Sequence, residues 1–225
     1  MTREHKLRLV KGFDLLAPFY DFLCFITSGN LILKSQLIYF DDLRDCRNVL
    51  LIGGGTGSFL VKLLRRYPDL NIISLDISPK MNNVAGQKIL KAGLNSKNVL
   101  FLDGTLADLP SNSKFDLVIT NYYLDLYSSD ELIYQIESIS KYLSKNAKWL
   151  FTDFHLPLTS IKNFLFQYVI VLLYLPFRLL VGLKINHLPN FDEGFRQNGI
   201  VELQSRKSLF GLLQTKLLQR NVVID

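Results

Sequence analysis

At residues 48–57 the sequence reads Asn48-Val49-Leu50-Leu51-Ile52-Gly53-Gly54-Gly55-Thr56-Gly57, in which mainly apolar residues lead directly into a cluster of glycines. Apolar residues then recur at helical spacing over residues 59–64, so a strand, a tight turn and a helix follow one another. Glycines let the backbone approach a ligand closely and adopt positive φ angles, and the start of a helix offers unpaired N–H groups to an anion. This segment therefore predicts a ligand-binding turn at the end of a buried strand.

The same order of strand and helix recurs outward from this turn. Further apolar strands are predicted at 71–75, 99–102, 115–120 and 148–154, with helices at 79–92 and 130–143. Near-continuous apolar strands that alternate with helices indicate a parallel sheet covered on both faces. The segments 200–207 and 212–223, after a loop around 186–194, predict a closing antiparallel hairpin. We therefore expect an α/β fold with a doubly wound, mostly parallel seven-stranded sheet.

Composition narrows the class of protein. The chain has 225 residues, of which 48% are hydrophobic, and this excludes wholesale disorder. Two cysteines cannot build a disulfide-rich scaffold, and no Cys/His cluster predicts a metal site. The formal net charge of +6 is compatible with an anionic ligand, a nucleic acid or an acidic membrane surface.

Hydropathy along the chain predicts a cytoplasmic location. Asp14 and Asp21 interrupt the apolar residues near the N-terminus, so no signal-peptide core of adequate length forms. The charge-free run 164–177 is shorter than the roughly 20 residues that span a bilayer, and it is interpreted as a buried or interfacial helix.

Two carboxylates follow neighbouring predicted strands. Asp76 lies 19 residues after Gly57, and Asp103 ends the next strand. Because ligands of open α/β sheets bind outside the carboxyl ends of the strands, both are expected beside the glycine turn. The alternatives are a helix N-cap for Asp76, although Ser78 suits that role better, and a turn residue for Asp103. Nucleotide-binding patterns fit less well: Ser58 departs from the dinucleotide fingerprint, and no Gly-Lys-Ser/Thr of a P-loop follows.

Together these segments resemble the class I S-adenosylmethionine-dependent methyltransferases over roughly residues 40–155. Residues 49–57 are similar to their first motif, and residues 76–81 to the segment after their second strand. Asp103-Gly104, Leu109-Pro110 and residues 115–118 are similar to the third and fourth strand regions. The opening at residues 13–21 further resembles the quinone-biosynthesis branch.

The resemblance implies a Rossmann-like methyltransferase fold with S-adenosylmethionine as cofactor. The glycines would hold the methionine part, Asp76 the ribose, Asp103 the adenine amine, and Ile77 and Met81 the ring faces. The implied cofactor-binding residues are Gly53, Gly54, Gly55, Thr56, Gly57, Asp76, Ile77, Met81, Asp103, Gly104 and Asn121. The family usually has an acidic residue two positions before the first glycine, where this chain has Leu51. The resemblance implies that this acid binds the ammonium group of the cofactor. Backbone carbonyls, Asp14 or Tyr20 are the candidates to bind that group here.

The whole of residues 1–225 is expected to form one methyltransferase domain. Residues 1–45 would be an N-terminal helical cap, indicated by apolar residues at spacings of three and four over 13–26. Residues 46–155 would be the cofactor-binding core. Residues 156–225 would supply an apolar cover helix, a loop and the closing hairpin.

The acceptor side is predicted from residues after the fourth and fifth strands. His155 follows the fifth strand, where a neutral imidazole could take the acceptor's proton near pH 7; the alternative is a histidine that packs or orients the substrate. Tyr20, Tyr122 and Tyr123 are expected to shape the acceptor pocket.

Three functions remain open at this point. The favoured one is methylation of a small apolar or aromatic molecule, with peripheral contact of residues 162–184 with the inner membrane surface. The second is a nucleic-acid methyltransferase. It is less favoured because the basic residues are dispersed and because residues 120–123 lack the Asn/Asp-Pro-Pro-Tyr pattern. The third is a non-catalytic binding protein of the same fold, for which Leu51 is the positive evidence.

Overall fold

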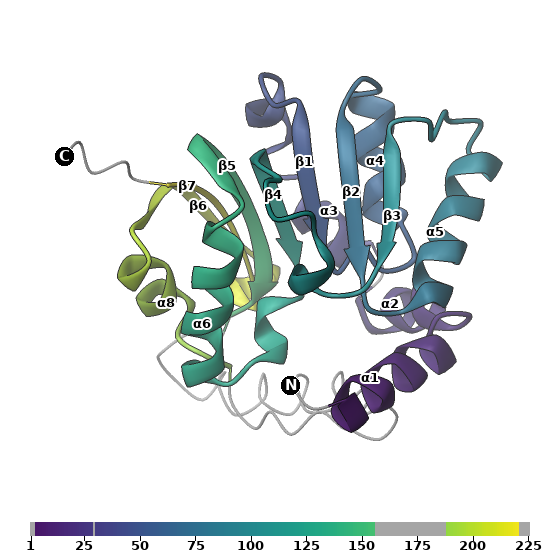
Figure 1. Cartoon of the computed structure of the whole chain (residues 1–225), viewed down its shortest axis with the longest axis horizontal. Coiled ribbons are helices and arrows are strands. Elements are labelled where there is room, and N and C mark those ends of the chain that lie inside the picture. The colour runs from purple at the N-terminus through teal and green to yellow at the C-terminus, as the bar shows by residue number, and fades with distance from the viewer. Residues whose placement is uncertain (1–2, 29, 156–187, 221–225) are drawn as a thin grey trace.

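The computed structural model describes residues 3–28, 30–155 and 188–220. Its central sheet follows the strand order β3-β2-β1-β4-β5-β7-β6 (Figure 1). The strands are β1 (Asn48–Ile52), β2 (Asn71–Asp76), β3 (Val99–Asp103), β4 (Phe115–Asn121), β5 (Leu143–Phe154), β6 (Ile200–Ser208) and β7 (Leu213–Arg220). Strands β1 to β5 pair in parallel, and β7 runs antiparallel to both β5 and β6. The predicted doubly wound sheet with a closing hairpin is thus confirmed.

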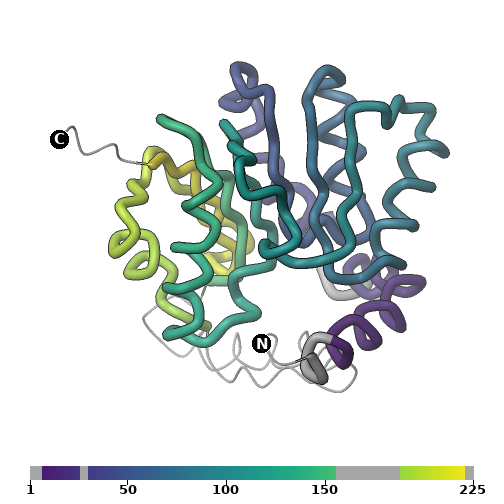
Figure 2. Tube along the Cα trace, in the orientation of Figure 1, coloured from purple at the N-terminus to yellow at the C-terminus, as the bar shows by residue number. Residues whose placement is uncertain are grey.

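The helices lie on both faces of this sheet and at one of its edges (Figure 1). The α-helices are α1 (Arg3–Leu16), α2 (Tyr20–Ser28), α3 (Leu31–Gln36), α4 (Ser58–Arg66), α5 (Pro79–Lys91), α6 (Ser129–Ser140) and α8 (Phe191–Gln197). Short 3₁₀ helices are η1 (Phe40–Leu43), η2 (Leu106–Asp108), η3 (Leu124–Leu126) and η4 (Leu209–Gly211). Figure 2 shows α1 and α2 below the carboxyl ends of the parallel strands, where a ligand of such a sheet binds.

The alternation of side chains along β1 divides the apolar core into two layers. Leu50 and Ile52 pack with residues of α6 and α8, whereas Val49 and Leu51 pack with residues of α4 on the other face. Trp149 and Phe151 of β5 are fully buried in the first layer, where the Trp149 indole donates a hydrogen bond of 2.8 Å to the Thr120 hydroxyl. Both faces are therefore covered, as the apolar strands predict.

The register brings the polar ends of the strands together. Strand β1 lies between β2 and β4, and this is the point where the strand order reverses. Asp76 at the end of β2 pairs with Asp103 of β3, and Asn121 at the end of β4 pairs with Thr152 of β5. Such a switch point leaves a crevice at the carboxyl ends of the strands.

Four predicted elements differ from the structure. The single helix expected over 13–26 is two helices, because Pro18 lies in the break and lacks a backbone donor. The expected loop around 186–194 is wrong from residue 191, where α8 begins after the Asn190 side chain accepts a hydrogen bond from the Glu193 backbone. Strand β5 starts at Leu143 rather than 148, and α6 ends at Ser140, because Leu143 pairs with Phe115. The predicted cover helix lies outside the described residues.

Candidate active site

The glycine turn is fixed between the end of β2 and the helix α5. The Gly55 backbone N–H donates to the Asp76 carboxylate at 2.9 Å, and its φ of +55° is a backbone conformation that favours glycine. Gly57 has a φ of +79°, and a Cβ added there would lie 2.6 Å from the Ala85 Cβ of α5. The turn therefore packs too closely against α5 to accommodate a side chain at position 57.

Asp76 is a buried carboxylate at the centre of this arrangement. It is 8% exposed and accepts a second backbone hydrogen bond, from the Ser78 N–H at 2.9 Å. Burial raises the pKa of Asp76 to about 6, although the two backbone donors act in the opposite direction. Ser78 itself caps α5 by accepting a hydrogen bond from the Met81 N–H, so the helix cap is Ser78 and not Asp76.

A small cavity of about 180 Å³ opens beside Asp76. Of the predicted cofactor residues, Gly53, Gly55, Asp76, Ile77, Met81, Gly104 and Asn121 line it. Asp103 does not line it; this exposed residue accepts a hydrogen bond of 2.7 Å from the Asn82 side chain. The predicted contact of Asp103 with an adenine amine therefore stays a prediction, whereas seven of the other ten predicted residues surround one space.

A larger cavity of about 500 Å³ also borders the glycine turn. All of residues 53–57 line it, together with mainly apolar side chains of α2 and α3. The two cavities share a wall formed by Phe13, Tyr20, Gly53, Gly55, Asn121, Tyr122 and Leu126. Residues of the glycine turn and of the end of β4 therefore border both cavities.

Carboxylates of the cap join it to the core at the beginnings of two helices. Asp21 accepts hydrogen bonds from the Thr56 hydroxyl at 2.6 Å and the Ser58 hydroxyl at 3.1 Å, and pairs with Lys88 at 2.5 Å. The bonds from Lys88 and Thr56 lower the pKa of Asp21 and outweigh the effect of its burial. Asp14 accepts a hydrogen bond from the Ser78 hydroxyl at 2.5 Å. The hydrogen bonds of Asp14 and Asp21 therefore hold the N-terminal cap against the core beside both cavities.

Aromatic residues after β4 line the cavities, and Tyr122 belongs to the wall that the two cavities share. Tyr122 has a φ of +51°, rare for an aromatic residue, and its N–H donates to the Thr152 carbonyl at 2.8 Å. Its hydroxyl lies 2.9 Å from the Ser35 hydroxyl, and its ring lies 4.9 Å from that of Phe154. Tyr123 lines only the smaller cavity, where its hydroxyl accepts from Tyr127 at 2.8 Å. Burial raises the pKa of Tyr20, Tyr122 and Tyr123, so these phenols stay protonated.

Two acids that the sequence analysis did not single out meet at the larger cavity. Asp125 of η3 lines it, and Asp153 of β5 lies in contact behind Asp125. The Asp125 N–H donates to the Asp153 carboxylate at 3.2 Å, and the two side chains are hydrogen-bonded to each other. Their exposed fractions are 2% and 0%, and burial raises the pKa of Asp125 to about 7 and that of Asp153 well above its usual range.

His155 stands apart from both cavities. It is not among the residues that line them in the described part of the chain. The His155 backbone N–H donates a hydrogen bond of 2.8 Å to the carbonyl of Leu212, the residue before β7. The charged groups that act on the imidazole are Lys207, Asp192 and Lys216. Burial, followed by Lys207, lowers the pKa of His155, so the imidazole is neutral near pH 7. Its role as a base stays a prediction.

Leu51 takes the place of the acid that the resemblance leads one to expect. It is 1% exposed, packs in the α4 layer and lines the larger cavity. Of the two side chains proposed to substitute for it, Asp14 lies at the start of α5 rather than at the glycine turn, and Tyr20 borders both cavities. The cap carboxylate that reaches the turn is Asp21, and its place beside Tyr20 in the sequence was the available signal.

Comparisons with known proteins find similarity to methyltransferases. A model of the family described as a methyltransferase domain matches residues 49–146. The malonyl-[acyl-carrier protein] O-methyltransferase of a Paenibacillus species is 31% identical over 110 residues, which cover 47% of this chain and 38% of the relative. The tRNA (guanine-N(7)-)-methyltransferase of Streptococcus pneumoniae is 31% identical over 72 residues, which cover 32% of this chain and 34% of that enzyme.

A solved structure extends the likeness of fold beyond this segment. The N-methyltransferase NodS of Bradyrhizobium japonicum, solved with S-adenosyl-L-homocysteine, aligns with a TM-score of 0.58 at 14% identity. The alignment covers 83% of this chain and 85% of NodS. The two curated relatives, by contrast, are matched over little more than a third of their length.

Proposed function

We propose, from the premise that residues 49–146 are a class I S-adenosylmethionine-dependent methyltransferase domain, that this chain transfers a methyl group to a small acceptor with an apolar or aromatic body. The observation that carries this proposal is the pair of cavities that share a wall at the glycine turn. The smaller cavity offers a carboxylate and apolar side chains, and the larger one is mainly apolar. Two different molecules can thus be held side by side.

The residues of the smaller cavity fit the adenosyl part of S-adenosylmethionine. Asp76 presents a buried carboxylate that accepts hydrogen bonds, as ribose hydroxyls require, and Ile77 and Met81 offer apolar contacts for an adenine ring. The Asn121 amide supports the same conclusion, because both of its polar atoms are buried without a hydrogen-bond partner among the described residues. When bound, the cofactor supplies an activated methyl group on a sulfonium sulfur.

The chain's own residues would bind and orient the two molecules. Gly53 and Gly55 leave the backbone accessible to the methionine part, and the Asp21 contacts with the glycine turn hold the cap over it. Tyr20 and Tyr122, which border both cavities, would set the approach of the acceptor and exclude water. When two reactants are held in contact and in the right orientation, this placement provides a large part of the rate enhancement.

Calorimetric titration with S-adenosylhomocysteine tests the cofactor site. Wild-type protein is expected to bind it saturably, and Asp76→Ala to lose the binding, whereas Asp69→Ala on an exposed turn serves as the matched control. A folded wild type that binds neither S-adenosylmethionine nor S-adenosylhomocysteine would refute the proposal. That outcome would favour the non-catalytic interpretation.

A nucleic acid is the alternative acceptor, which the net charge of +6 and the likeness to the pneumococcal tRNA enzyme favour. The mainly apolar wall of the larger cavity favours a small molecule instead. A gel shift at several salt concentrations distinguishes the two, because phosphate contacts release counterions and make binding strongly dependent on salt. A specific, salt-dependent shift would support the nucleic-acid alternative.

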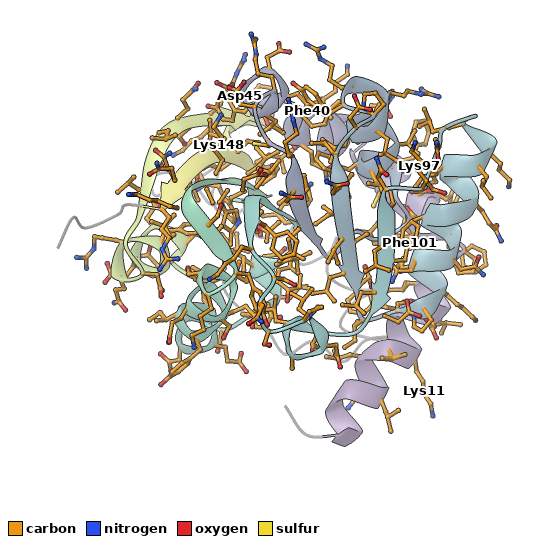
Figure 3. The ribbon with its side chains drawn as sticks, turned by 45° about the horizontal axis from the view of Figure 1, so that its top comes forward. Lys11, Phe40, Asp45, Lys97, Phe101 and Lys148 are labelled. Carbon is orange, nitrogen blue, oxygen red and sulfur yellow. The ribbon has the colours of Figure 1, made fainter. Side chains whose placement is uncertain are left out.

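We further propose peripheral contact of the cap with an anionic membrane surface. Leu15, Phe19, Phe22 and Phe25 are each more than half exposed on α1 and α2 or the turn between them, and Phe25 also lines the larger cavity. Lys11 of α1 projects away from the sheet (Figure 3) and would face the lipid headgroups. The predicted contact over 162–184 lies outside the described residues. Among the described helices, none is both long and apolar enough to cross a bilayer.

Flotation with vesicles tests this contact. Wild-type protein is expected to float with phosphatidylcholine vesicles that contain phosphatidylglycerol and not with phosphatidylcholine alone. The double variant Phe19→Ser/Phe22→Ser should lose most of this binding. Wild-type protein that stays at the bottom of the gradient with both kinds of vesicle would refute the proposal.

A further inference from the structure

An ion pair of Asp21 and Lys88 lies at the glycine turn, on the wall of the larger cavity. Asp21 comes from α2 of the N-terminal cap and Lys88 from the last turn of α5, and both line the cavity. Among the described residues, the other charged side chain that lines it is Asp125, whose carboxyl is hydrogen-bonded to that of Asp153. Asp21 and Lys88 therefore bring two opposite charges to a mainly apolar space.

Hydrogen bonds to the glycine turn fix the position of this pair. One Asp21 oxygen accepts from the Thr56 hydroxyl at 2.6 Å and from the Ser58 hydroxyl at 3.1 Å. The other Asp21 oxygen accepts from the Lys88 ammonium at 2.5 Å. The Lys88 ammonium also donates to the Ser58 hydroxyl at 2.7 Å and to the Thr56 hydroxyl at 3.3 Å. A carboxylate accepts about four hydrogen bonds, so the Asp21 oxygen that faces Lys88 can accept one more.

Stability alone explains this ion pair poorly. The Lys88 and Asp21 side chains are 27% and 49% exposed, and ion pairs that are so accessible to water contribute little to stability. A second observation points to a ligand in the same cavity. Asn121 lines it, and both polar atoms of the Asn121 amide are buried without a hydrogen bond within the described part of the chain. Buried amides almost always have partners, so this one indicates a place for a polar group of a bound molecule.

The end of β1 offers no charge to such a molecule. Leu51, two positions before the first glycine, is 1% exposed and lines the same cavity as the ion pair. S-adenosylmethionine and S-adenosylhomocysteine each carry an ammonium and a carboxylate group at their amino-acid end. An ion pair is complementary to such a zwitterion, because each charge meets its opposite. The charges that β1 lacks are therefore available from α2 and α5.

We propose that Asp21 and Lys88 bind the amino-acid end of the cofactor, with its ammonium group on the Asp21 carboxylate and its carboxylate group on the Lys88 ammonium; this inference rests on the proposed function. Lys88 exchanges its longest hydrogen bond, to Thr56, for the charged group of the ligand. Asp21 thus replaces, from the N-terminal cap, the acid that the resemblance leads one to expect at Leu51. Cofactor binding and docking of the cap are then coupled, because both use the same carboxylate.

Calorimetric titration of the full chain with two ligands tests this inference. S-adenosylhomocysteine carries the amino-acid end, and 5′-methylthioadenosine is the matched ligand that lacks it. Wild-type protein is expected to bind S-adenosylhomocysteine about 100-fold more tightly, because two hydrogen bonds between charged groups are added. In Asp21→Asn and in Lys88→Met the ratio of the two affinities should fall by about tenfold, the loss of one such hydrogen bond.

The ratio of affinities separates a binding role from a structural one. A loosened cap would weaken both ligands to the same degree and leave the ratio unchanged. Asp21→Glu, which keeps the charge, should keep most of the ratio, and Asp41→Asn, which removes the acid of an exposed ion pair with Arg66, should behave as wild type.

Two results would overturn the inference while the proposed function stands. The first is a wild type that binds both ligands equally, and the second is an Asp21→Asn variant with the same ratio of affinities as wild type. A folded wild type that binds neither ligand would refute the proposed function, and this inference with it.

Discussion

Replacement of Gly57 by alanine tests how closely the glycine turn packs against α5. Two costs can be worked from the structure. The φ of +79° costs an L-residue about 1–2 kcal/mol, because the left-handed region brings Cβ close to the backbone. The added Cβ would also lie 2.6 Å from the Ala85 Cβ and 2.8 Å from its Cα, and such overpacking costs about 1–3 kcal/mol. We expect the free energy of unfolding to fall by about 2–5 kcal/mol in total.

Gly93→Ala separates the two costs. Gly93 has a similar φ of +69°, but no heavy atom lies within 4 Å of a Cβ added there. This variant should lose only the conformational part, about 1–2 kcal/mol. Gly199→Ala, with a φ of +66° and the same open surroundings, is a second control. The difference of about 1–3 kcal/mol between Gly57→Ala and the controls then measures the contact with α5.

Urea denaturation and thermal melts followed by circular dichroism give the required free energies. For a chain of this size each kcal/mol lowers Tm by about 2–4 °C, so the extra loss in Gly57→Ala is readily resolved. The affinity for S-adenosylhomocysteine should also fall in Gly57→Ala and not in the two controls. Equal destabilisation of Gly57→Ala and Gly93→Ala would refute the close packing of the turn against α5.

Three further predictions follow from the acids of the site. Because burial raises the pKa of Asp76 to about 6, the Asp76 side chain becomes protonated as the pH falls below that value. Calorimetry should therefore show weaker binding of S-adenosylhomocysteine at pH 5 than at pH 7.5. An affinity that does not change with pH would contradict the role of the carboxylate. The pKa of Asp125 rises from 3.8 to about 7 on folding, so the folded chain holds the extra proton and loses stability as the pH rises from about 4 to 7. Urea titrations of Asp125→Asn should show a shallower decrease than wild type, and parallel curves would argue against this assignment. Asp21→Asn weakens a half-exposed ion pair with Lys88 that contributes at most about 1 kcal/mol, so Tm should barely change. Hydrogen exchange of the backbone amides in α2 should accelerate, because the cap is held less firmly. An unchanged rate of hydrogen exchange would show that Asp21 does not hold the cap.

Local patterns were sufficient for the core of the fold. The apolar run of β1, the glycines after it and the order of later strands each depend on neighbours within a few residues. A buried parallel strand must be apolar on both faces, and a tight turn beside a helix requires glycine, so these features can be read without tertiary contacts. The placement of Asp76 at the end of β2 followed from the same topology.

The misplaced elements failed for a physical reason. Apolar spacing over 13–26 is helical on both sides of Pro18, and periodicity does not register the break. Helix α8 is only seven residues long and packs Phe191 and Phe195 against Phe151, so tertiary packing rather than local propensity stabilises it.

The sequence by itself determined the sheet, its glycine turn and the buried carboxylate beside that turn, because each is encoded by adjacent residues. Only the tertiary structure decided which distant acids enter the site. It brought Asp21 to Thr56 across 35 residues and Asp153 to Asp125 across 28, and it set His155 outside both cavities. An acid in an otherwise apolar segment has the same local pattern whether it caps a helix, pairs with a second acid or faces solvent. The folded arrangement of its neighbours alone distinguishes these roles.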